Sequence, residues 1–164
     1  GALGGLSGAD LKCRTLASSA GLENPTSFRA WLSDGTSSPA SRFKSIDKAA
    51  APYVLLDGRI LAEDFVELVD FGPRTGISLT ETGEIVFGEF VWTNTSAFGE
   101  VFSATNHCAD WTAGAVELKS RIGYNALANE QGPVWDAWAA ERQWTSLLNH
   151  ACSVPRRLYC FEDA

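Results

Sequence analysis

The feature that most constrains this chain is its set of four cysteines, which lie at Cys13, Cys108, Cys152 and Cys160. The count is even and no Cys-x-x-Cys pair occurs, a combination that favours a disulfide framework over a zinc site or a redox motif. Three pairings are possible, and the residues alone do not choose among them. The alternative is four buried, free cysteines in a cytosolic protein. We favour disulfides that link the two ends of the domain, because Cys152 and Cys160 flank one predicted strand and its approach.

Length and composition indicate a single folded domain. The chain has 164 residues, of which 45% are hydrophobic, so it can build a core and is not a disordered chain. Its net charge of −7 argues against nucleic acid, polyanions or anionic membrane as the main partner, and no apolar run is long enough for membrane insertion. We expect the glycine-rich residues 1–6 to be a linker or the cut end of a longer secreted protein, and residues 7–164 to form the domain.

Two helices and a strand are predicted in the first third of the chain. Ser7 can cap a helix that Gly21 ends, with an inward stripe of Ala9, Cys13, Leu16, Ala17 and Ala20. Residues 28–32 alternate like a half-buried strand. Ser38 and Pro39 then supply the N-cap and first position of a second helix, which Pro52 stops and whose inward residues are Phe43, Ile46 and Ala50.

The rest of the chain predicts short strands and one long loop. Asp57-Gly58 suits a type I′ turn between residues 53–56 and 59–61, and Thr82-Gly83 centres a second hairpin. A short helix at 62–69 lies between them. Residues 90–92 and 157–161 are predicted strands, regular structure also returns at 144–148, and residues 93–134 form a long loop region, which is usually functional in a compact domain. The pattern as a whole predicts an α+β fold with short antiparallel strands.

Several of these segments carry a resemblance to a known family. The chain resembles the endostatin domain of collagens XV and XVIII and the bacterial endostatin-like outer-surface adhesins. The resemblance spans residues 7–162 and is carried by residues 7–13, 20–22, 28–33 and 49–57, by Val91-Trp92, by Cys108-Ala109-Asp110-Trp111, and by Cys152 with residues 158–162. It implies a C-type-lectin-like fold. It also implies nested disulfides, Cys13 with Cys160 and Cys108 with Cys152.

The resemblance does not extend to the known ligand sites of such domains. Sugar-binding C-type lectins hold calcium with a Glu-Pro-Asn or Gln-Pro-Asp triplet, and residues 93–134 contain neither. The N-terminal histidine zinc site of endostatin has no counterpart, because the first histidine is His107, and its arginine-rich heparin surface has none in this acidic chain. His107 and His150 would become neighbours if Cys108 bonds Cys152, and could then hold zinc with Asp110. Two hydrogen-bonded or exposed histidines are the simpler interpretation, and we expect no metal and no cofactor.

Motifs of catalysis are missing as well. The chain has no Gly-x-Ser-x-Gly, no His-Glu-x-x-His and no phosphate-binding glycine loop. The carboxylates of residues 63–70 are typical of a solvated helix face. We therefore expect a protein that is not an enzyme.

The candidate ligand-binding residues lie in the long loop region and just after it, within residues 93–143. Trp135 and Trp138 are three residues apart and would share one face of a helical turn, where they form either an exposed binding patch or a small satellite core. Trp144 is expected in the main core. The other candidates are amides, which suit sugar hydroxyls and protein backbone alike, at Asn94, Asn106, Asn125 and Asn129.

Two functions follow from these observations. The first is a non-catalytic recognition or adhesion domain, secreted or displayed on a cell surface, that binds a surface glycan or an extracellular protein through a face supplied by residues 93–143. The alternative is a structural tip module of a larger secreted fibre, with the domain forming a homotrimer at the end of an upstream stalk.

Overall fold

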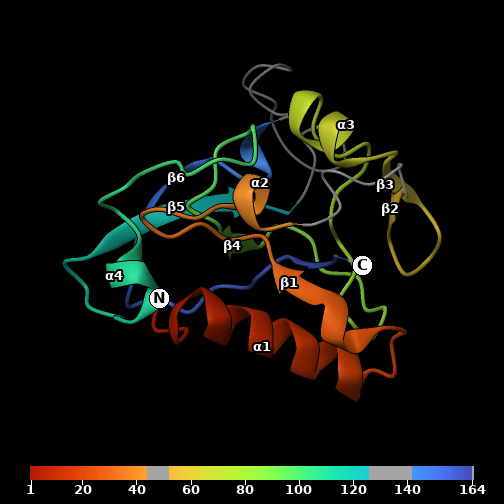
Figure 1. Ribbon diagram of the computed structural model, residues 1–164, viewed down its shortest axis with the longest axis horizontal. Coiled ribbons are helices and arrows are strands. Elements are labelled where there is room, and N and C mark those ends of the chain that lie inside the picture. Colours follow the sequence, from red (N-terminus) through yellow and green to blue (C-terminus); the bar gives the residue numbers. More distant parts are fainter. Residues whose placement is uncertain (44–51, 126–141, 164) are drawn as a thin grey trace.

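The computed structural model describes residues 1–43, 52–125 and 142–163, which form an α+β domain, as predicted (Figure 1). The described residues contain four α-helices: α1 (Gly5–Ser19), α2 (Pro39–Arg42), α3 (Phe65–Asp70) and α4 (Cys108–Trp111), besides the 3₁₀ turn η1 (Pro25–Ser27). Their strands form three small antiparallel sheets, which pair β1 (Phe28–Ala30) with β7 (Cys160–Glu162), β2 (Tyr53–Val54) with β3 (Ile60–Ala62), and β5 (Lys119–Tyr124) with both β4 (Phe90–Trp92) and β6 (Leu148–Ala151).

Two nested disulfides join distant parts of the chain. Cys13 in α1 bonds Cys160 in β7, and Cys108 in α4 bonds Cys152 just after β6, with sequence separations of 147 and 44 residues. The pairing implied by the resemblance is confirmed. Closing loops of this length stabilises a domain by roughly 3–5 kcal/mol each through the unfolded state.

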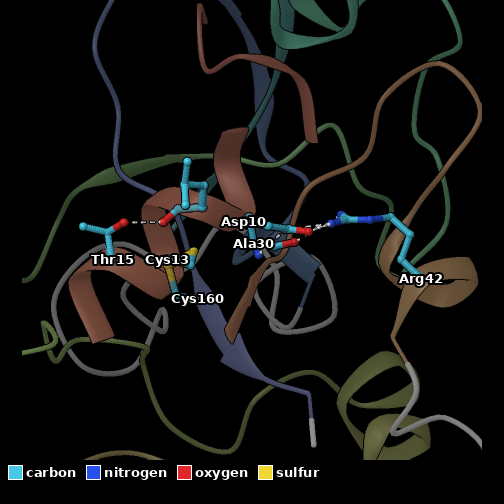
Figure 2. Close-up of a disulfide and its surroundings, with 7 residues drawn as sticks. Asp10, Cys13, Thr15, Ala30, Arg42 and Cys160 are labelled. Carbon is cyan, nitrogen blue, oxygen red and sulfur yellow. Dashed lines mark hydrogen bonds and ion pairs between the residues drawn. A yellow bond between two sulfur atoms is a disulfide. The ribbon is translucent and has the colours of Figure 1, made fainter. Parts of the chain in front are cut away.

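A buried carboxylate joins the same helix to two further elements. Asp10, one turn before Cys13, accepts a hydrogen bond from the Ala30 N–H at 3.0 Å, and Arg42 Nη2 lies 2.7 Å from each of its carboxylate oxygens (Figure 2). Arg42 Nη1 also donates to the backbone carbonyl of Leu32 at 2.9 Å. The charges of Asp10 and Arg42 are therefore paired and hydrogen-bonded where α1, β1 and α2 meet, which is the condition for burying them.

The core consists of two clusters, one on each side of β1 and of the residues that follow it. Trp31 packs in the first cluster with aromatic rings that include Phe43, Phe65, Trp144 and Phe161. Ala30 and Leu32 point the other way, into a cluster built around both disulfides, Trp92, Trp111 and Ile122. Trp144 is in the core, as predicted.

The first helix differs from its prediction at both the start and the stripe. It begins at Gly5 instead of after Ser7, with Gly4 as N-cap in a left-handed conformation (φ 83°). Ala9, Cys13 and Ala17 are buried, but Leu16 is 44% exposed, so its place in the inward stripe is wrong. Residues 1–6, expected to be a linker, are packed: the N–H groups of Leu3 and Gly4 donate to the Trp111 carbonyl, and the N-terminus lies beside α4 (Figure 1).

Two other local predictions are corrected. The second helix begins at Pro39 as expected but ends at Arg42, because Phe43 is already extended (φ −79°, ψ 130°). Ile46 and Ala50 lie outside the described residues. The hairpin around Asp57-Gly58 is present, yet only Gly58 has a positive φ in this fully described turn, so the turn is not type I′.

The long loop region contains regular structure that the sequence analysis missed. Strand β5 occupies residues predicted as loop, with Ser120 and Ile122 buried on one face and Lys119 and Arg121 on the other. The inward serine hides the apolar alternation that identifies a strand. The last predicted strand also begins later, at Cys160.

Helix α4 is a single left-handed turn. Its four residues have φ angles of 54°, 51°, 51° and 62°, a conformation that costs an L-residue about 1–2 kcal/mol. Cys108 is held at one end by its disulfide, and at the other end the buried Trp111 donates its indole N–H to the Ser33 carbonyl at 2.8 Å. The packing at both ends over-determines a turn that the backbone disfavours.

Replacing Asp10 tests the buried ion pair. Asp10→Asn leaves Arg42 buried without its counter-charge, so we expect the free energy of unfolding to fall by about 3–5 kcal/mol in urea titrations. Asp57→Asn is the matched control, since the Asp57–Arg59 pair is exposed and should leave stability unchanged. Equal effects of the two variants would contradict the assignment.

Replacing Ala109 tests the left-handed turn. Ala109 is exposed and has a positive φ, so Ala109→Gly relieves steric strain and should raise the free energy of unfolding by about 1 kcal/mol. Ser18→Gly, at an exposed position in right-handed α1, should lower it by about 0.5 kcal/mol. A loss of stability in both variants would show that α4 is not strained in solution.

Candidate ligand-binding face

A short loop that follows β4 presents two phenylalanines to solvent. Residues 94–102 fold back on themselves through a bridge between Thr95 and Val101, and the Phe102 N–H donates to the Asn94 carbonyl. The loop is anchored to β5, because the N–H groups of Thr93 and Asn94 both donate to the Arg121 carbonyl. The side chains of Phe98 and Phe102 are 50% and 42% exposed, an unusual position for two phenylalanines in one loop.

A guanidinium group stacks on each of these rings. The Cζ of Arg121 lies 4.2 Å from the centroid of Phe102, and the Cζ of Arg142 lies 4.8 Å from that of Phe98. Both distances are well inside the range of cation–π attraction. The rings therefore form a rigid base under two planar, positively charged groups.

Ser146 links the two stacks. Its hydroxyl oxygen accepts a hydrogen bond from Arg121 Nε at 3.0 Å, and its backbone N–H donates to the Arg142 carbonyl at 3.0 Å. The stacks thus belong to one surface, which we call the Arg–Phe cluster and define as Phe98, Phe102, Arg121 and Arg142.

Arg121, like Arg14, Arg156 and Arg157, makes no ion pair with a carboxylate in the described part of the chain. Four other arginines each contact a carboxylate: Arg29, Arg42, Arg59 and Arg74. Partial burial lowers the pKa of its guanidinium, which nevertheless stays charged at every physiological pH. Its Nη1 and Nη2 groups have no partner within the described ranges.

Two exposed polar residues flank Arg121 on the same face of the sheet. Asn149 is its direct cross-strand partner on β6, and Lys119 lies two residues earlier on β5. Directly paired residues have side chains about 5 Å apart on one side of a sheet. An amide and an ammonium therefore stand near the unpaired guanidinium, in a chain whose net charge is −7.

The predicted asparagines occupy different environments. Asn94 is fully buried and donates its amide to the Ser103 carbonyl at 2.9 Å. Asn125 is also buried, donating to the Val86 carbonyl and accepting from the Glu89 N–H. Both fix backbone segments and do not face solvent. Asn106 is exposed, while Trp135, Trp138 and Asn129 lie outside the described residues.

The Arg–Phe cluster was not predicted from the sequence. Phe98 and Phe102 are four residues apart in a segment without helical or strand period, so nothing marks them as a pair. Arg121 is part of a strand that was predicted as loop. An alternation of Lys119 and Arg121 with Ser120 and Ile122 was the one available signal.

The two histidines lie on opposite sides of Ser120 in the sheet. Ser120 on β5 pairs with His107 on one side and with His150 on the other, which puts the two backbones about 10 Å apart. His107 Nδ1 accepts the Asp110 N–H at 2.7 Å, so Nε2 carries the proton and donates to the Ala104 carbonyl. Among the described residues, no three His, Cys, Asp or Glu side chains come together as metal ligands would.

In the described part of the chain, no helix has both the length and the apolar character needed to cross a bilayer. No model of a known protein family matches the chain, and no curated protein matches it.

Proposed function

We propose that this chain is a non-catalytic extracellular recognition or adhesion domain with a C-type-lectin-like fold of the endostatin type. It binds a cell-surface glycan or an extracellular protein through the face formed by the long loop region. Two disulfides support an extracellular location, because such bonds persist in oxidising compartments. The nested pairing and the antiparallel contact of β1 with β7, which brings distant parts of the chain together, agree with the resemblance.

The Arg–Phe cluster is the observation that carries the proposal. Aromatic residues and arginine are enriched at binding interfaces, and arginine and large aromatics dominate their energetic centres. Here two exposed rings and a guanidinium without a carboxylate partner occur together on a loop that is fixed by backbone hydrogen bonds to β5. A surface pre-ordered in this way has little side-chain entropy to lose when it binds.

The cluster places two positive charges, those of Arg121 and Arg142, on the surface of an acidic domain. The described carboxylates elsewhere in the chain already neutralise several arginines, including Arg29, Arg42 and Arg74. Arg121 and Lys119 are left without such partners among the described residues. The Arg–Phe cluster is therefore a local site of positive charge on a face that also carries the exposed carboxylates of Glu100, Asp110 and Glu117.

Removing the rings tests the proposal. Labelled protein is applied to a glycan array and to a panel of purified extracellular proteins, and affinity is then measured for any target that binds. We expect Phe102→Ala and Phe98→Ala each to weaken binding by about 1–3 kcal/mol, as truncated aromatic anchors do.

Phe71→Ala is the matched control for these variants. Phe71 follows α3 and is 70% exposed, so its replacement removes an equally accessible ring from another part of the surface and should leave binding unchanged. Two outcomes would contradict the proposed function. The first is that the protein binds nothing on either panel and instead hydrolyses generic substrates. The second is that all three variants bind with the same affinity as the parent.

A further inference from the structure

The N–H groups of Arg121 that have no partner define which chemical group of a ligand it can bind. Nε is occupied by the Ser146 hydroxyl, so the two terminal nitrogens, Nη1 and Nη2, remain. They lie side by side in one plane and present parallel N–H bonds, which match the two oxygens of a carboxylate in a bidentate pair. Stacking on Phe102 fixes the plane of the guanidinium, so this fork has a defined direction.

The groups around the fork suit a sugar ring. Asn149, paired with Arg121 across the sheet, is exposed and offers an amide donor and an amide acceptor to hydroxyl groups. Phe98, the second ring of the cluster, is 50% exposed and provides an apolar surface for sugar C–H groups. A carboxylate anchor, a hydroxyl partner and an apolar contact together correspond to one acidic sugar residue.

Charge and size favour that ligand over larger anions. With a net charge of −7, the protein repels polyanions and strongly acidic proteins at long range, whereas a single carboxylate is attracted at short range by Arg121 and Lys119. A stable protein–protein interface needs about 800 Å² from each partner. Two rings, one guanidinium and one amide are few groups beside the roughly 20–30 residues that each side of such an interface contributes.

We infer that the Arg–Phe cluster binds the carboxylate of an acidic sugar residue, such as a uronic or sialic acid at the end of a glycan, with Arg121 as the bidentate anchor. This inference rests on the proposed function, because it names the ligand class of the same face. Asn149 orients the sugar hydroxyls, and the exposed ring of Phe98 covers the apolar side of the sugar.

The test uses small probes of defined charge. Methyl β-glucuronide and the methyl glycoside of N-acetylneuraminic acid are titrated into the whole chain, alongside methyl β-glucoside and the methyl ester of the glucuronide, and binding is followed by NMR or calorimetry. We expect at least one of the two acidic sugars to bind, and to bind roughly 10- to 100-fold more tightly than its neutral or esterified analogue, as loss of a charged hydrogen-bond pair implies.

Two arginine variants complete the experiment. Arg121→Gln should lose roughly 10- to 100-fold in affinity for the acidic sugar. Arg59→Gln should bind like the parent, because Arg59 is exposed, pairs with Asp57 and lies on the β2–β3 hairpin. Thermal unfolding of both variants confirms that they are folded.

The outcomes separate the ligand class from the proposed function. Three results would each overturn the inference. Acidic and neutral sugars bind with equal affinity, or Arg121→Gln keeps the parent's affinity for the acidic sugar. The third is that an Asp/Glu-rich peptide binds while neither acidic sugar does. In those cases the recognition function stands if Phe98→Ala and Phe102→Ala still weaken the partner found on the panels. It fails together with the inference if those variants bind that partner like the parent.

Discussion

The rest of the structure depends on how the buried carboxylate of Asp10 fixes α1 against β1 and α2. Asp10 accepts the Ala30 N–H and pairs with Arg42, and one turn later Cys13 bonds Cys160 of β7 (Figure 2). Because residues three apart share a helix face, one side of α1 supplies both the ion pair and the disulfide. These two links hold β1 between the core clusters. They matter because β1, with only three residues, can make few strand hydrogen bonds of its own.

The position of β1 is transmitted to the ligand-binding face by backbone and side-chain hydrogen bonds. Trp31 donates its indole N–H to Thr145, the residue before Ser146, and Thr93 donates its hydroxyl to the Thr145 carbonyl at 2.6 Å. Ser33 pairs with the Thr93 backbone and accepts the indole N–H of Trp111. The residue that holds Arg121 and the loop that carries its stacking partner are thus fixed to the same frame. This explains how exposed side chains keep a defined geometry.

Much of this frame could be predicted from the sequence, and the binding face could not. The disulfide role of the cysteines was expected from their number and spacing, and their pairing was implied by the resemblance. The stripe of Ala9, Cys13 and Ala17 and the apolar strand at 90–92 follow from residue period. The predicted second helix has its N-cap and its first turn, but it ends at Arg42 because the next residue, Phe43, is extended. The ion pair of Asp10 with Arg42 is invisible in sequence, since it joins polar residues 32 positions apart that would be expected on the surface. Arg121 was missed for the same reason that β5 was missed, because an inward serine breaks the apolar pattern of its strand.

The measurement that tests the account most directly is a chemical-shift map of the labelled chain titrated with methyl β-glucuronide and the methyl glycoside of N-acetylneuraminic acid. The account predicts that the acidic sugar that binds shifts the Arg121 Nε–H signal and the backbone amides of Phe98, Phe102 and Asn149, while signals of the β2–β3 hairpin stay in place. Chemical-shift changes concentrated on that hairpin would contradict the account. So would an Arg121 Nε–H signal that does not shift with either sugar at concentrations that saturate the other shifts.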